Sequence, residues 1–152
     1  MALVSASTLK RSFDFIWADD PALDKEHPDF NYEAWQETGE AIRLPFKAGQ
    51  SPTIFRCRKL PRKALLDLQR IMREAHNKEP AEAEHSLALV AMSAVECGLK
   101  SVENWDMPLK LEAGRLSDET MDLLFEISPG LIWELGSVIF RESMGLEASP
   151  KQ

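Results

Sequence analysis

Five side chains that can bind metal ions lie within ten residues of one another, namely His76, Glu79, Glu82, Glu84 and His85. Zinc sites on helices place their histidine and carboxylate ligands one turn apart on one face. His76 and His85 are nine residues apart, and Pro80 lies between them. This spacing does not suit a shared metal ion, so we expect neither a metal site nor another cofactor.

The motifs of other catalytic chemistry are missing from the sequence. There is no GxSxG nucleophile elbow, no GxxxxGK[ST] phosphate loop and no GxGxxG dinucleotide motif. Cys57 and Cys97 are the only cysteines, and they show neither a CxxC spacing nor a local catalytic signature. Two such cysteines are typical of free thiols in a reducing compartment. We expect a protein without enzymatic activity.

The charges are distributed unevenly along the chain. Residues 43–73 contain nine basic side chains and one acid, whereas the rest of the chain has nine basic and 24 acidic residues, for a net charge of −7. Such a basic stretch can bind nucleic acid phosphates or an acidic protein, or can be neutralised by acidic residues of its own chain. The acidic net charge and the few aromatic residues in this stretch favour a protein partner over nucleic acid.

Residues 1–38 combine aromatic and acidic side chains, and Pro21 and Pro28 exclude a long helix. We expect short helical turns at most, in a strap that docks on its own domain or in an arm that docks on a partner, the strap being favoured. Five residues are candidates for partner contacts: Phe13 and Trp17 in this segment, and Arg56, Arg58 and Arg62 in the basic stretch.

Apolar alternation is visible in residues 40–46 and 53–58, which are joined by a connector containing Gly49 and Pro52. This pattern predicts a β-hairpin over about 40–58, and Pro45 places its first strand at a sheet edge.

The period changes to that of a helix at Pro61. Leu65, Leu68, Met72 and Ala75 recur at spacings of three and four residues and predict an amphipathic helix of about 17 residues. A second helix is expected from Pro80 to about 97, because proline suits a first turn. Gly98 follows it at the left-handed position that ends many helices. These two helices should pack as an antiparallel pair.

The C-terminal part is expected to contain a packed loop over 98–109 around Trp105, then two short helices. Ser117 should cap the first, which ends near Phe125, and Ser128 should start the second, which ends near Met144. Trp133 and Phe140 should pack in the core, with a partner contact as the alternative. The fold class is therefore α+β, mainly α, with a segment 1–38, a domain 39–146 and a polar tail 147–152. No apolar stretch is long enough for a membrane helix, and no secretory signal is visible.

Four segments in this order carry a family resemblance: PTIFRCRKLPR from Pro52, VECGLKSVENW from Val95, LSDETMDLL from Leu116 and PGLIWELGSVI from Pro129. Over about 42–145 the chain resembles tail assembly chaperones of tailed bacteriophages. The resemblance implies a protein that holds the helical tape-measure protein, or another tail or virion protein, without cofactor or catalysis. It also implies a location in the host cytoplasm, with association with the virion left open.

The acidic, aromatic segment 1–38 is longer than this family implies, so a second class stays open. In it, the chain is a phage regulator or inhibitor that binds a host defence complex or nucleic acid through its charged surfaces. The sequence also leaves open whether the chain forms a homo-oligomer.

Overall fold

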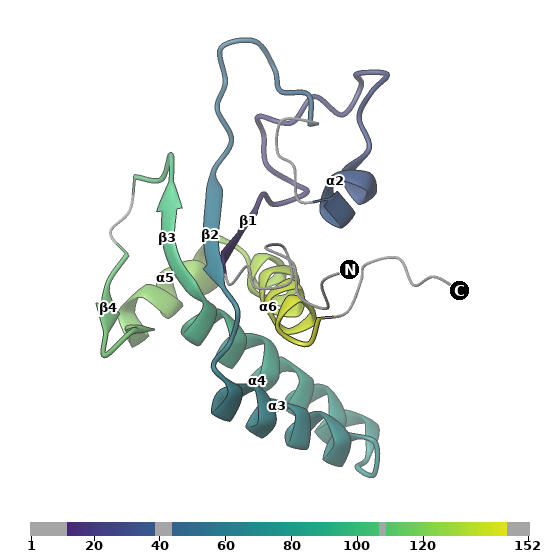
Figure 1. Cartoon of the computed structure of the whole chain (residues 1–152), viewed down its shortest axis with the longest axis vertical. Helices are drawn as coiled ribbons and strands as arrows, with labels where there is room; N and C mark the ends of the chain where they lie inside the picture. Colours follow the sequence, from purple (N-terminus) through teal and green to yellow (C-terminus); the bar gives the residue numbers. More distant parts are fainter. Residues whose placement is uncertain (1–11, 39–43, 107–108, 146–152) are drawn as a thin grey trace, which may run out of the picture.

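The computed structural model describes residues 12–38, 44–106 and 109–145, which form an α+β fold that is mainly helical (Figure 1). The expected fold class is therefore confirmed. In chain order the elements are β1 (Ser12–Phe15), α2 (Tyr32–Thr38), β2 (Ile54–Arg58), α3 (Arg62–Ala75), α4 (Pro80–Gly98), β3 (Leu99–Glu103), β4 (Leu111–Glu112), β5 (Arg115–Leu116), α5 (Asp118–Ile127) and α6 (Pro129–Ser143).

A three-stranded sheet in the order β1-β2-β3 is antiparallel throughout. Along β2, Phe55 and Cys57 are buried, whereas Arg56 and Arg58 are exposed. Phe15 of β1 lies opposite Phe55 and is buried with it. One face of the sheet therefore packs on the core and the other meets solvent, as is common in antiparallel sheets.

The predicted hairpin over 40–58 is wrong. β2 pairs with β1 and β3, which are both distant in sequence, and Phe46 forms only an isolated bridge to Leu23. Residues 40–43 of the first predicted strand lie outside the described residues. The hairpin was predicted because residues 40–46 and 53–58 are close in sequence. The apolar residues that match the buried face of β2 are instead those of β1 and β3.

The predicted packed loop over 98–109 is also wrong in its first half, which forms β3. Val102 of β3 lies opposite Phe55, and the ring of Trp105 packs edge-on against Phe55 at 5.9 Å between centroids. Gly98 is the last residue of α4 and does not take the left-handed conformation expected for it. A Cβ there would lie 2.7 Å from Ile139 Cγ2, so close approach to α6 requires the glycine.

The expected helices are confirmed. α3 and α4 form an antiparallel pair (Figure 1), with Arg62 as the first residue of α3 and Pro80 as the first of α4. Ser117 caps α5 by accepting a hydrogen bond from the Thr120 N–H at 3.3 Å, and Ser128 caps α6 in the same way. α5 extends two residues past its expected end.

Two apolar clusters hold the chain together. The larger one joins the inner face of the sheet to α3, α4, α5 and α6. The smaller one contains Ile16, Leu23, Trp35 and Leu44 and forms the centre of what we call the N-terminal lobe, residues 16–38 with the facing segment 44–53. The sequence predicted no regular structure beyond short helical turns in residues 1–38, and strand β1 shows that this prediction is wrong. In β1, Phe13 and Phe15 alternate with polar residues, and the strand forms an edge of the sheet.

Candidate interaction site

The outer face of the sheet carries Arg56, the first of the predicted partner residues. Its guanidinium lies 3.6 Å from Asp14 of β1 and donates a hydrogen bond to Glu103 of β3. The hydrogen bond to Glu103, and then the charge of Asp14, raise the pKa of Arg56. Both strands that flank β2 thus neutralise this arginine, and its charge is used within the chain.

Arg58 and Arg62 have a different environment. They are the last residue of β2 and the first of α3, both are exposed, and neither forms an ion pair with another described residue. The backbone between them is fixed because Leu60 is buried and its N–H donates to Ser143 Oγ of α6 at 2.8 Å. The fold therefore holds, at a defined place, two cations that have no ion-pair partner among the described residues.

Helix α3 continues this basic surface. Leu68 and Ala75 are its buried residues, and the opposite side of the helix carries Leu66, which is 56% exposed. Spacings of three and four residues place cations around this leucine. We define the α3 basic face as Arg62, Lys63, Arg70 and Arg73 with Leu66 at its centre.

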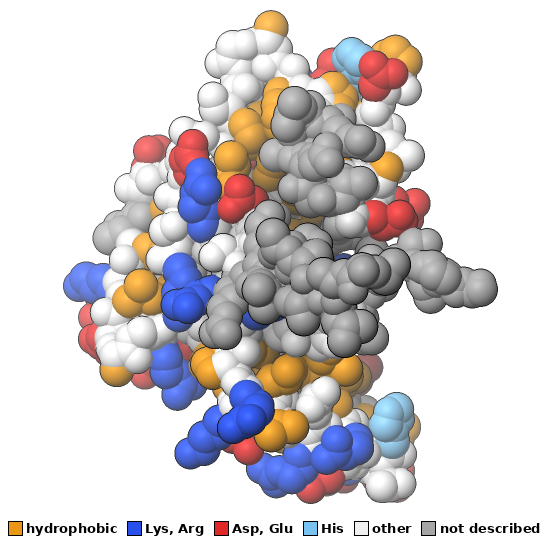
Figure 2. Space-filling view, viewed as in Figure 1, with side chains coloured by type: hydrophobic (Ala, Val, Ile, Leu, Met, Phe, Trp, Pro, Cys, Tyr) orange, Lys and Arg blue, Asp and Glu red, His pale blue; other side chains and the backbone are white. Residues whose placement is uncertain are grey.

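The charges of the α3 basic face are mostly unpaired within the described residues. Only Arg70 has an acidic partner, Glu74 one turn later at 3.9 Å. α3 packs mainly on α4 and lies at the outside of the molecule, and basic side chains gather over it at the lower end of the view (Figures 1 and 2). In the part of the chain that the structure describes, this face is therefore exposed to solvent.

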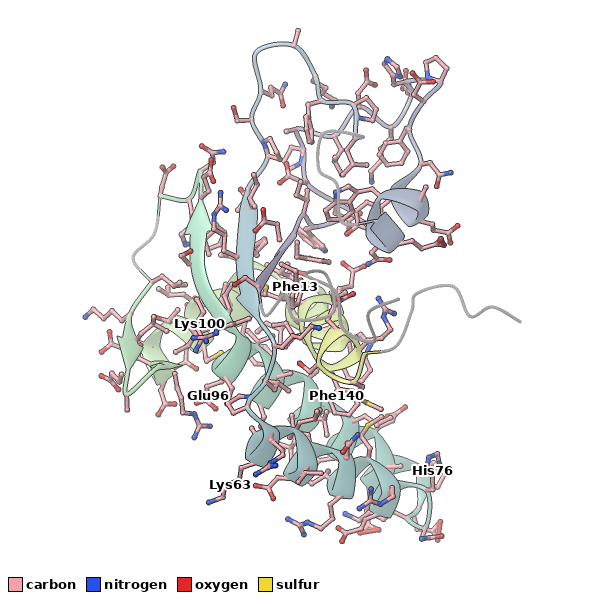
Figure 3. All side chains as sticks on the ribbon, viewed as in Figure 1. Phe13, Lys63, His76, Glu96, Lys100 and Phe140 are labelled. Carbon is pink, nitrogen blue, oxygen red and sulfur yellow. The ribbon has the colours of Figure 1, made fainter. Side chains whose placement is uncertain are left out.

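The predicted aromatic contacts, Phe13 and Trp17, lie elsewhere. Phe13 is opposite Cys57 on the inner face of the sheet and packs against the larger cluster, so it faces away from Arg58. Figure 3 shows Phe13 between the sheet and α6, far from Lys63, which extends outward from α3. Trp17 is half-buried against the same cluster. The structure therefore does not bring these aromatics together with the arginines.

Trp17 also contributes to a polar contact between the N-terminal lobe and α6. Burial, and then the charge of Asp19, raise the pKa of Glu134, while a hydrogen bond from Trp17 lowers it. Burial and the charges of Glu134 and Asp19 also raise the pKa of Tyr32, whose hydroxyl donates to the Ile16 carbonyl. This contact orients the lobe on α6.

The N-terminal lobe contains an open hollow of about 390 Å³. Its lining combines four carboxylates with two lysines and two apolar side chains: Asp19, Asp20, Asp24, Glu26, Lys25, Lys47, Pro21 and Leu23. Asp20 is buried and accepts the N–H groups of Ala22 and Thr53, each at 2.9 Å, so it shapes the loop. Asp24 and Glu26 form no ion pair with another described residue.

Two large apolar side chains are exposed although this was not predicted from the sequence: Trp133 was expected in the core, and Leu66 was not considered. Trp133, expected in the core, is 48% exposed, because the buried side of α6 is formed by its neighbours Leu131, Ile132 and Leu135. Phe140 is partly buried against the larger cluster. Leu66 was not singled out in the sequence, although its place off the apolar stripe of α3 was a readable signal.

Both cysteines are free, as expected, and burial raises the pKa of Cys57. Within the described ranges, no group of three His, Cys, Asp or Glu side chains is arranged to hold a metal ion. In the same ranges no single helix is long and apolar enough to cross a membrane; α5 and α6 meet that criterion only as a pair bent by 116°.

No family model, curated protein or solved structure matches the chain. The resemblance to phage tail assembly chaperones therefore stays a prediction.

Proposed function

We propose that this chain is a non-enzymatic binding protein that holds an acidic, amphipathic segment of another virion protein during phage assembly. Its docking surface is the α3 basic face together with Arg58. The single observation that supports this most strongly is the set of cations around exposed Leu66, of which only Arg70 has an acidic partner among the described residues.

The charge pattern favours a protein partner with carboxylates. A leucine within a ring of cations offers an apolar anchor with a charged rim, the usual arrangement at protein interfaces. An amphipathic helix can place leucine and glutamate side chains at matching spacings of three and four residues. The tape-measure protein, largely helical in the resembled family, is one candidate partner.

The first test uses a designed probe. A 14-residue peptide, the length of α3, carries leucine on one helical stripe and glutamate on the two beside it; a second peptide has the same composition in scrambled order. Amide chemical shifts in ¹⁵N-labelled protein should change along α3 with the patterned peptide only. Shift changes confined to other elements, or equal binding of both peptides, would contradict the proposal.

Charge reversal tests the same surface. Arg58→Glu with Arg62→Glu should weaken peptide binding by about tenfold or more, because two attractive contacts become repulsive. The matched control is Lys110→Glu with Arg115→Glu, which changes the net charge equally on the β4–β5 side and should bind like the wild type. The thermal melt of the Arg58→Glu/Arg62→Glu variant should stay close to that of the wild type, since these exposed cations form no ion pair with a described residue. The control loses the Arg115–Glu96 and Lys110–Glu119 pairs and should melt slightly lower, but it should still bind the peptide.

The assembly context is tested by affinity capture from phage-infected cells, with nuclease in half of the samples. Wild type should recover a helical virion protein with or without nuclease, and the Arg58→Glu/Arg62→Glu variant should lose it. Recovery that disappears with nuclease would instead support the nucleic-acid class, and recovery of a host defence complex would support the inhibitor class.

A further inference from the structure

The two charged regions of the chain lie at opposite ends of its long axis (Figures 1 and 2). Residues 12–38 carry eight carboxylates and one lysine, whereas 58–73 carry six cations and the single acid Asp67. Fields between exposed charges are screened within about 10 Å at ordinary salt. The carboxylates of the N-terminal lobe therefore do not neutralise the α3 basic face of the same molecule.

These two ends also complement each other in shape. The hollow in the N-terminal lobe has exposed Pro21 in its lining, beside buried Leu23, with Asp24 and Glu26 among its acids. The α3 basic face has the opposite arrangement, a protruding leucine within a ring of cations. Lys25 and Lys47 also line the hollow, but its four acids outnumber these two lysines. Lys25 is already paired with Asp19 at 3.4 Å.

We propose that the α3 basic face of one molecule docks on the acidic hollow of a second copy, with Leu66 against the exposed ring of Pro21. The contact joins two different surfaces, so it is heterologous. When two molecules form this contact, the dimer still has one unoccupied α3 basic face and one unoccupied acidic hollow. Association therefore continues into open chains or closes as a ring, in contrast to a symmetric dimer that stops at two.

This self-association is separate from the proposed partner, but it uses the same α3 basic face. Binding of a second copy and binding of an acidic partner segment therefore exclude each other on that face. A partner present in excess should dissociate the chains by mass action. Free protein would be kept with its basic face covered until a partner arrives.

The test is sedimentation of the full chain over concentrations up to about 1 mM, the range in which weak contacts form. Wild type should show a mass that rises with concentration at about 0.01 M salt and falls toward the monomer at about 0.5 M, because screening weakens charge contacts. A wild type that stays monomeric across this range would overturn the proposal, as would a mass that stops at the dimer without any higher species.

Two charge-reversal variants identify the faces. Lys63→Glu with Arg70→Glu changes the α3 basic face, and Asp24→Lys with Glu26→Lys changes the hollow. Each alone should raise the dissociation constant by more than about tenfold. The control Asp122→Lys with Glu126→Lys on α5 has the same charge change as the hollow variant and should associate like the wild type.

Mixing the two variants separates docking from damage to the fold. Each keeps one wild-type face, so an equimolar mixture should form mixed complexes although neither variant associates alone. Failure of the mixture to associate would overturn the proposal. The hollow variant should still bind the patterned acidic peptide, so loss of self-association with intact peptide binding leaves the proposed function standing.

Discussion

Helices α3 and α6 both pack on α4, and they differ in what they leave exposed. α6 approaches α4 closely, since a Cβ added at Gly136 would lie 2.3 Å from the Ala91 carbonyl oxygen. It buries six residues, whereas α3 buries two and presents cations and a leucine to solvent. The same supporting helix therefore has a structural partner on one side and, on the other, a helix whose outer face is free to bind.

The difference predicts that α6 is the more sensitive helix. Gly136→Ala should destabilise the fold by about 3 kcal/mol, because the new Cβ meets Ala91 backbone that cannot move without separating the helices. The matched change Gly130→Ala lies in the same helix, where the added Cβ meets only Ser128 Oγ at 3.4 Å. It should shift stability by less than about 1 kcal/mol. Urea unfolding followed by circular dichroism measures both, and equal losses would contradict the comparison.

Within α3, the two sides should respond differently to the same truncation. Leu68→Ala removes a buried side chain and should cost about 2 kcal/mol. Leu66→Ala removes an exposed one and should change stability by less than about 0.5 kcal/mol. The second variant should instead weaken binding of the patterned peptide. A large stability loss for Leu66→Ala would mean that this leucine is structural, and it would remove the anchor from the proposed docking surface.

The helices of this fold could be predicted from the sequence because their signals are local. The stripe of Leu65, Leu68 and Met72 and the caps at Ser117 and Ser128 each act within one or two turns. The sheet could not, because β2 pairs with strands that lie about 40 residues away on either side. Its alternation shows that β2 is a strand but does not identify its neighbours.

The candidate site was predictable in part for the same reason. The excess of cations in 43–73 is readable from composition, and so is their position off the apolar stripe of α3. Which arginine is neutralised depends on strand pairing, since Asp14 and Glu103 reach Arg56 only across the sheet. The separation of Phe13 from Arg58 likewise depends on strand pairing, which places Phe13 beside Cys57 on the inner face of the sheet and leaves Arg58 exposed.

Arg56 and Arg62 test this distinction between a paired and an unpaired cation. Arg56→Gln should lower the melting temperature slightly at low salt, because it removes contacts to Asp14 and Glu103, and the effect should shrink as salt screens them. Arg62→Gln should leave the melting temperature unchanged and weaken peptide binding. Calorimetry at two salt concentrations, paired with a peptide titration, gives both readouts, and a reversed pattern would exchange the roles assigned to the two arginines.

The smallest effect is expected at Glu134, where the N-terminal lobe meets α6. Burial and Asp19 raise the pKa of this carboxyl above its ordinary value, so the folded state binds the proton more tightly than the unfolded chain. Its ionised form therefore destabilises the fold, and this loss appears as pH rises through the ordinary glutamate pKa toward the raised one. Glu134→Gln should be slightly more stable than the wild type at pH 7, because its amide oxygen still accepts from Trp17 without a charge. The advantage should vanish below pH 4, where the wild-type carboxyl is protonated in both states; an advantage that persists there would assign the effect to packing instead of charge.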